Sequence, residues 1–252
     1  MLMTGFWSLG IALQALLLLR GLSIGLGRSF PAFYSYIAYV MVTDVLRFIT
    51  FRWYPNHYAA VFWVTQFLAL LAGSFVIFEI FRVGLRPFPG AAKMARYLLL
   101  LVFGAVFAKA VAGGSGGFLA WLARTSVEIE RDLRMVQELA ILTLVILFLY
   151  YAVPFGRNLG GIVLGYGLFV LTIIFQFTLW SYGVVLPSIW SYVQSVTYFL
   201  AVVVWVWALW SRAPAAATGV QPRLEEDYKL VWMATRNQLE RVLARLGSVA
   251  RP

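Results

Sequence analysis

The sequence predicts an all-α, polytopic membrane protein: a seven-transmembrane-helix bundle with its N-terminus outside and its C-terminus cytoplasmic, plus a C-terminal amphipathic helix. Of the 252 residues, 62% are hydrophobic and only 12% are charged, about half the charged fraction of an ordinary soluble domain. Lipid can cover this excess of apolar surface, and a spanning helix needs roughly 20 apolar residues. The spans and their short connectors occupy residues 1–212, and residues 213–252 form a cytoplasmic linker and helix.

Composition excludes several kinds of site. The chain has no cysteine and a single histidine, His57, so disulfides, thiolate clusters and haem held by two histidines are impossible, and a structural zinc site is not expected. We expect no cofactor, although we expect bound lipid. The net charge of +10 does not indicate nucleic acid, because the basic residues lie at helix ends. Anionic lipid headgroups at the cytoplasmic face are the expected partner.

Four long apolar segments precede a glycine-rich joint. We expect the first four spans at about residues 6–26, 32–51, 58–81 and 94–112. The connectors are residues 27–31 with Pro31, the Tyr54-Pro55-Asn56 turn and the basic, proline-containing loop 82–90. Arg20 interrupts the first span and is long enough to extend its charge to the membrane surface. Glu79, three residues before Arg82, is expected to be an interfacial acid that reaches the surface in the same way.

The Gly-Gly-Ser-Gly-Gly stretch at residues 113–117 predicts a flexible joint before the fifth span. Thr125 and Glu128 fit a capping box at a helix start, and Glu130 and Arg134 fit an i,i+4 ion pair. We therefore expect the fifth helix to protrude from the membrane before it continues to about residue 153. The sixth and seventh spans are expected at about residues 159–182 and 186–210.

Small residues mark two helix faces. Gly161 and Gly165 in the sixth span have the small-xxx-small spacing that permits close helix contact. Gly21 and Gly25 give the first span a similar face. Such faces offer surfaces for another membrane subunit or for a second copy of the chain. No internal repeat is visible, so the sequence gives no support to an inverted-repeat transporter.

Lysine and arginine are divided unequally between two alternating sets of connectors. One set, together with the tail, holds Arg20, Arg28, Arg82, Arg86, Lys93, Arg96, Arg157 and the basic residues after residue 211. The other set holds Arg52, Arg124, Arg131 and Arg134. Because cytoplasmic loops of membrane proteins are enriched in lysine and arginine, the first set predicts the cytoplasmic side.

The tail has the pattern of an amphipathic helix. Pro222 suits a first helical position, and acidic residues then precede basic ones, in the order that the helix dipole favours. Apolar residues recur at helical spacing: Leu224, Tyr228, Val231, Trp232, Leu239, Val242 and Leu246. Two interpretations stay open: a helix that lies on the membrane or the bundle, and a helix that docks on a partner or associates with itself.

Polar side chains within the spans gather at one depth, in the extracytoplasmic half. They are Asp44, Arg47, Gln66, Lys109, Glu138, Gln176 and Gln194. Ionisable groups are unfavourable in a bilayer, so each is a functional candidate. One hypothesis is a polar cavity that opens outward and holds a small polar ligand or part of an ion path. The other is structural, with Asp44–Arg47 and Lys109–Glu138 pairs and glutamines that join helices.

Three sequence stretches resemble a group of uncharacterised bacterial seven-helix inner-membrane proteins. They are residues 27–33 (GRSFPAF), residues 78–82 with 86–90 (FEIFR and RPFPG) and residues 161–169 (GIVLGYGLF). The resemblance implies a fold class and an inner-membrane location, and no activity. The chain is not expected to be a retinal-binding rhodopsin, because its seventh span has no lysine for a Schiff base.

The sequence leaves three function classes open. A non-enzymatic sensor-like or receptor-like bundle, or an accessory subunit of a membrane complex, agrees best with the outward polar layer and the separate tail. A small-solute transporter or a proton or ion channel is the alternative, but it calls for polar residues through the full membrane depth. An enzyme is the least supported, because the sequence has no carboxylate pair with a histidine and no nucleophile–base motif.

Overall fold

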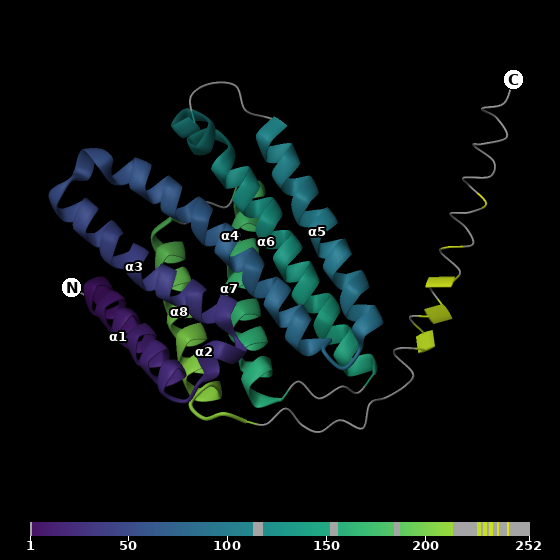
Figure 1. The fold of residues 1–252 in the computed structure, drawn as a ribbon. Coiled ribbons are helices and arrows are strands. Elements are labelled where there is room, and N and C mark those ends of the chain that lie inside the picture. Colours follow the sequence, from purple (N-terminus) through teal and green to yellow (C-terminus); the bar gives the residue numbers. More distant parts are fainter. Residues whose placement is uncertain are drawn as a thin grey trace, which may run out of the picture.

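The computed structural model describes residues 2–112, 118–151, 156–183 and 187–213. In the tail it describes Glu226, Asp227, Lys229, Leu230, Trp232, Met233, Arg236 and Arg241. All regular structure in these residues is helical, so the predicted all-α class is confirmed. The elements are α1 (Leu2–Ser23), α2 (Leu26–Ser29), α3 (Pro31–Trp53), the 3-10 helix η1 (Pro55–His57), α4 (Tyr58–Gly84), α5 (Pro89–Ala112), α6 (Phe118–Tyr150), α7 (Arg157–Ser181) and α8 (Pro187–Ala208) (Figure 1).

Several of these helices are long and apolar enough to cross a membrane. Over the described residues there are five such segments: Pro31–Trp53, Pro55–Gly84, Pro89–Val106, Ile129–Tyr150 and Arg157–Gln176. The corresponding apolar segments of α1 and α8 are shorter, Ser8–Ser23 and Tyr192–Ala208. The chain is therefore a multi-pass membrane protein.

The helices form a ring with one helix outside it. Neighbouring contacts run from α1 to α3, α4, α6, α7, α8 and back to α1, whereas α5 contacts only α4 and α6 among the described elements. Figure 1 shows α5 at one edge of the bundle, with α1 at the opposite edge. The interior of the bundle is therefore built by α1, α3, α4, α6, α7 and α8. Helix α5 packs on the outer side of α4 and α6.

The connector after α1 is more regular than the sequence suggested. Gly25 adopts a left-handed conformation with φ 73°, which glycine reaches without steric strain, and this residue ends the path of α1. Residues 26–29 then form the one-turn helix α2, with Leu26 buried. The predicted loop is therefore a helical turn that brings Phe30 to the start of α3.

Glu79 caps α3 from the neighbouring helix α4. Its carboxylate accepts hydrogen bonds from the backbone amides of Ala32 (2.9 Å) and Phe33 (2.8 Å). Pro31 at the first helical position has no N–H, so these two amides are the first donors of α3 that need a partner. Glu79 is only 5% exposed. The prediction of an acid that reaches the membrane surface was wrong, because a helix N-terminus binds this carboxylate inside the protein.

Helix α6 is continuous from Phe118 over its 33 residues, which is about 50 Å and longer than a bilayer core. Thr125 and Glu128 lie within the helix, so the predicted capping box does not mark its start. The predicted Glu130–Arg134 ion pair is confirmed, with 3.0 Å between Nε and Oε1. Arg134 is buried rather than placed in a connector.

Glycines let α7 and α8 approach closely, as their spacing predicted. A Cβ on Gly165 would stand 2.9 Å from two ring carbons of Trp205, and one on Gly161 would overlap Ala208. The same approach lets Trp205 Nε1 donate to the Ile162 carbonyl at 3.3 Å. A Cβ on Gly21 would likewise overlap the ring of Tyr34. At these three glycines the small-residue faces are covered within the chain, so they do not offer the partner surface that the sequence suggested.

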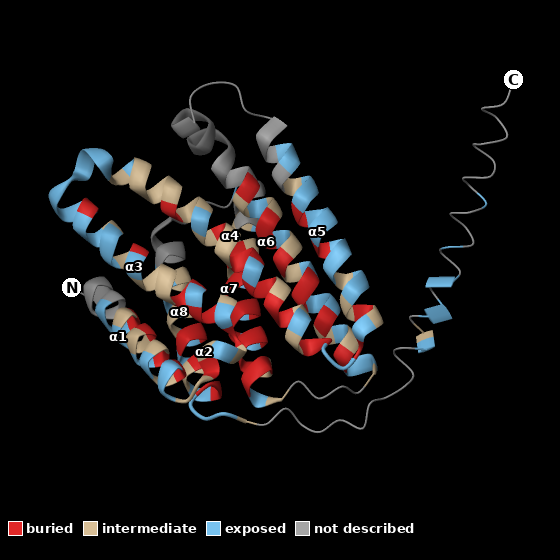
Figure 2. Ribbon diagram, viewed as in Figure 1, coloured by how far each residue is buried: buried red, intermediate tan, exposed pale blue. Residues whose placement is uncertain are grey.

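The two halves of the bundle are packed differently. Large side chains that are fully buried lie in the half next to α2, among them Phe33, Phe148 and Trp205. Phe33 and Trp205 meet edge to face with 5.2 Å between ring centroids. Figure 2 shows the buried positions gathered at this end of the bundle. This half is a dense apolar core, and the polar interior lies in the other half.

Candidate functional site

A cavity of about 370 Å³ lies inside the helical ring, in the half away from the apolar core. Every ring helix contributes to its wall, and α5 does not. The polar lining residues are Gln14, Tyr36, Thr43, Asp44, Arg47, Gln66, Arg134, Tyr192, Gln194, Ser195 and Tyr198. We call this space the ring cavity. Its volume falls within the range of small-molecule sites in proteins.

Asp44 and Gln14 form one polar corner of the ring cavity. The Gln14 side-chain amide donates to Tyr198 Oη (2.7 Å) and, over a longer distance, to Asp44 Oδ2 (3.5 Å). Gln14 is 1% exposed, and its Oε1 atom has no hydrogen-bond partner within the described residues. A buried acceptor without a donor is unfavourable by about 1–3 kcal/mol. This corner is therefore suited to a donor group from a molecule inside the cavity.

Arg47 occupies the adjacent wall. Its Nε donates to Thr65 Oγ1 (2.8 Å) and its Nη2 to Gln66 Oε1 (3.1 Å), and its guanidinium lies 4.7 Å from the centroid of the Phe62 ring. The predicted Asp44–Arg47 ion pair is not formed: in the described part of the chain no carboxylate lies within 4.0 Å of Arg47. Two opposite charges therefore line the same cavity, one helical turn apart, without neutralising each other by direct contact.

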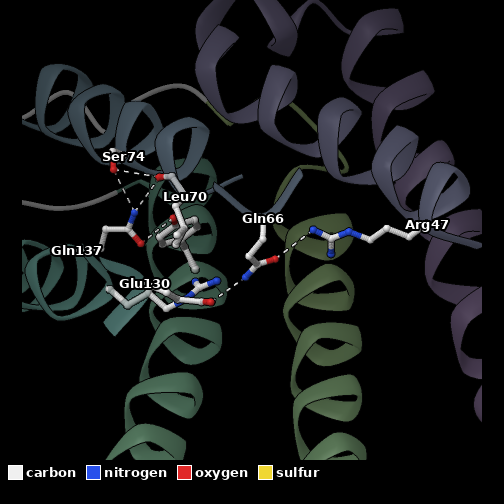
Figure 3. Close-up of polar contacts among 8 residues, drawn as sticks. Arg47, Gln66, Leu70, Ser74, Glu130 and Gln137 are labelled. Atoms are coloured by element: carbon white, nitrogen blue, oxygen red, sulfur yellow. Dashed lines mark hydrogen bonds and ion pairs between the residues drawn. The ribbon is translucent and has the colours of Figure 1, made fainter. Parts of the chain in front are cut away.

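Gln66 links this arginine to a second one (Figure 3). Its Nε2 donates to Glu130 Oε1 at 2.7 Å, and the same oxygen accepts from Arg134 Nε. Arg134 also lies over the Phe169 ring, 5.4 Å from its centroid. Glu130, which does not line the cavity, thus neutralises the charge of Arg134. The side chains of Arg134 and Arg47 both line the cavity. The glutamine fixes the spacing of the two guanidinium groups.

A buried polar contact lies below this chain of residues, toward the apolar core. Gln137 is fully buried and donates to Ser74 Oγ (3.3 Å), and its Oε1 accepts from Tyr166 Oη (3.2 Å). A Cβ on Gly73 would stand 3.3 Å from the Gln137 amide and would overlap Tyr166 Oη, so the small residue permits this approach. Gln137 does not line the ring cavity. Through these hydrogen bonds it joins α6 to α4 and α7 (Figure 3).

Three of the predicted candidates lie away from the ring cavity. Lys109 is on α5, 66% exposed, and pairs with Asp132 at 2.6 Å, so the predicted Lys109–Glu138 pair was wrong. Glu138 is half-buried, and its Oε2 has no hydrogen-bond partner among the described residues. Gln176 is half-buried on α7 and is not part of the lining. Asp44, Arg47, Gln66 and Gln194 do share the cavity wall.

Sequence reasoning missed several lining residues. Gln14 was detectable as a polar residue within an apolar run. Arg134 was counted with the outer connector because the helix around it was expected to protrude from the membrane, whereas the candidate span already begins at Ile129. Tyr36 and Tyr198 carry no signal of their own, because aromatic residues are common in every span of this chain. Their place in the site depends on helix rotation, which only packing decides.

The predicted apolar face of the tail falls mostly outside the described residues. Leu224, Tyr228, Val231, Leu239, Val242 and Leu246 are all outside them, and Trp232 is described and 54% exposed. A hydrogen bond joins the tail to the bundle: Tyr151 Oη, just after α6, donates to Asp227 Oδ2 at 2.8 Å. Neither interpretation of the tail helix is tested by this contact.

No protein-family model, no curated protein and no solved structure matches this chain. The resemblance to bacterial seven-helix proteins therefore stays a prediction. The site has to be interpreted from its own geometry.

Proposed function

We propose that this chain is a non-enzymatic, receptor-like or sensor-like protein of the bacterial inner membrane that binds a small polar solute in the ring cavity. In this proposal α1 and α8 also span the membrane, which gives seven spans with the N-terminus outside and the C-terminus cytoplasmic. Each is 22 residues long, enough for a bilayer core. The unequal distribution of lysine and arginine supports the orientation. The ring cavity then lies in the extracytoplasmic half.

The observation that carries the proposal is the unpaired Asp44 and Arg47 in one cavity. An isolated charge is unfavourable in the membrane unless a partner or water neutralises it. Asp44 offers an acceptor for an ammonium group, and the guanidinium groups of Arg47 and Arg134 offer donors for a carboxylate. A small zwitterion supplies both partners at once. We therefore propose a solute of the amino-acid type, with one cationic and one anionic group.

The packing of the other half supports binding rather than conduction. Polar residues of the ring cavity give way to Phe33, Phe148 and Trp205, which are fully buried. A conducting path would require polar or wet surface at this level too. A solute can therefore enter the ring cavity and be bound without a continuous route across the bundle.

Ligand binding can be tested by thermal unfolding of the purified protein in lipid nanodiscs. The 10 tryptophans make intrinsic fluorescence a direct readout of thermal unfolding while each of the free L-amino acids is added at millimolar concentration. We expect at least one of them to raise the melting temperature. A ligand present at a hundred times its Kd contributes about 2.7 kcal/mol, which corresponds to roughly 5–10 °C.

Variants assign that shift to the cavity. The Asp44→Asn and Arg47→Gln variants are expected to lose it, whereas Gln176→Ala, a change of an intramembrane polar residue outside the lining, keeps it. If no amino acid stabilises the wild type, or if the double variant D44N/R47Q still responds fully, the zwitterion site is wrong. Uptake of the same amino acid by proteoliposomes would show that the protein is a transporter and not a receptor.

A further inference from the structure

A second cavity lies outside the ring, between α4, α5 and the start of α3. Its volume is about 840 Å³. Three basic side chains, Arg82, Lys93 and Arg96, line it near the α4–α5 turn, and Phe75, Leu99 and Leu100 line it further along the two helices. We call it the α4–α5 groove. It shares no lining residue with the ring cavity.

The groove is basic at one end and apolar at the other, because it lies between two antiparallel helices whose basic residues are at the same end. On α4, Phe75, Glu79 and Arg82 recur at helical spacing and run toward the end of the helix. On α5, Lys93, Arg96 and Leu100 recur in the same way and run away from its start. Since α4 ends where α5 begins, both faces are basic at the same end and apolar at the same depth. The Phe78 and Phe103 rings meet at 5.5 Å where the helices contact each other.

The basic end is open to a ligand. Arg82, Lys93 and Arg96 are exposed, and none of them makes an ion pair in the described part of the chain. The acid at this end, Glu79, lines the groove too, but both of its oxygens accept backbone amides of α3. Three cations and one already engaged carboxylate leave an excess of positive charge beside an apolar surface.

We propose that the α4–α5 groove binds an anionic phospholipid from the side, with the phosphate at Arg82, Lys93 and Arg96 and an acyl chain along Phe75, Leu99 and Leu100. Guanidinium and ammonium groups bind phosphate oxygens strongly. A soluble phosphate shares this headgroup chemistry, but it would leave the apolar part of the groove uncovered. The lipid supplies both parts, and the candidate spans on α4 and α5 place the groove in contact with the bilayer.

The test is competitive lipid binding to the detergent-purified protein, measured by native mass spectrometry. Equimolar phosphatidylglycerol and phosphatidylcholine have matched acyl chains and differ in net charge. We expect the wild type to retain phosphatidylglycerol over phosphatidylcholine by roughly tenfold or more, because each basic residue near an anionic lipid surface contributes a several-fold preference. The triple variant R82Q/K93Q/R96Q is expected to retain the two lipids equally.

Matched controls separate charge from position and from folding. Arg86→Gln removes an exposed cation from the same turn that does not line the groove, so it keeps the preference. Arg96→Lys keeps the charge and most of the preference. If the triple variant does not fold, Arg96→Gln alone is expected to lower the preference several-fold. The proposal is overturned if R86Q reduces the preference as much as R96Q does. Displacement of the lipid by millimolar glycerol 3-phosphate would also overturn it and indicate a soluble phosphate ligand.

Discussion

At the scale of single residues, the structure is decided by which polar atoms find partners. Glu79 binds two backbone amides at the start of α3, whereas Glu138 has a buried oxygen without a hydrogen bond in the described part of the chain. The two residues look alike in the sequence, as single acids in apolar segments. Their surroundings give them opposite effects on stability, since a satisfied charge stabilises a helix end and an unsatisfied one does not.

Replacement of these two acids tests that difference. We expect Glu79→Ala to lower the free energy of unfolding by about 3 kcal/mol, because two charge-assisted hydrogen bonds are lost and two amides are left without partners. Glu138→Gln serves as the comparison at an acid with an oxygen that has no hydrogen bond in the described part of the chain, and it is expected to change the free energy of unfolding by less than about 0.5 kcal/mol, or to raise it. Thermal unfolding in detergent measures both. Equal losses from the two variants would contradict the assigned role of Glu79.

At the scale of elements, α7 and α8 depend on glycine for their contact. Gly165 lies against the indole of Trp205, and that indole donates to the Ile162 carbonyl on α7. At the ends of the same helices, Asn158 Nδ2 donates to the carbonyls of Ala208 and Ser211, both at 3.0 Å. These bonds satisfy the carbonyl of Ala208, the last residue of α8, which has no partner within the helix, and the carbonyl of Ser211 just beyond it. The close packing at Gly165 and the hydrogen bonds of Asn158 together fix how α8 is placed in the ring.

Adding a methyl group on this face should therefore disturb the bundle. Gly165→Ala is expected to destabilise the protein by about 1–3 kcal/mol, because the indole has to move out of a well-packed site. Gly167→Ala is the control on the same helix: its Cβ would stand 3.6 Å from Ile141 Cγ2, an ordinary contact. Both variants gain the same helix propensity, so a difference in unfolding temperature reports the packing alone. A Gly165→Ala variant as stable as Gly167→Ala would show that α8 can shift freely.

At the scale of the whole molecule, six helices enclose a polar cavity in one half and an apolar core in the other. Helix α5 lies outside this ring and forms the α4–α5 groove with α4. The separation places the two proposed sites in different halves of the bundle. Ligand binding in the ring cavity and lipid binding in the groove can therefore be altered independently by substitution.

The proposed orientation has a direct test because the chain contains no cysteine. Asn56→Cys places a thiol in η1, and Arg86→Cys places one in the exposed turn between α4 and α5. In intact bacterial cells, a membrane-impermeant maleimide is expected to label the first variant and not the second. After cell lysis both are labelled, which controls for accessibility. The reverse pattern in intact cells would mean that the bundle has the opposite orientation in the membrane. Labelling of both variants would mean that η1 and this turn lie on the same side.

Much of the fold could be predicted because each span carries its own apolar signal. The helix positions agree with the predicted spans to within a few residues for α3 and α8, but α5 begins earlier, at Pro89, where proline suits the first helical position. The site could be predicted only in part. Asp44, Arg47, Gln66 and Gln194 were found from the polarity of single residues, while the partners of these residues were not. Lys109 lies on α5 and does not line the ring cavity, which its depth along the helix could not reveal, because depth does not show which way a side chain points.

The sequence by itself determined the class of protein and the approximate positions of its long helices, because lipid requires continuous apolar segments and their length and composition are local properties. Only the tertiary structure decided that α5 stands outside the ring, that Arg47 bonds to Gln66 rather than to Asp44, and that Glu79 caps a different helix. These facts depend on how each helix is rotated against its neighbours. That rotation is set by contacts between residues far apart in the chain, at glycines and buried aromatic rings, and no single segment encodes it.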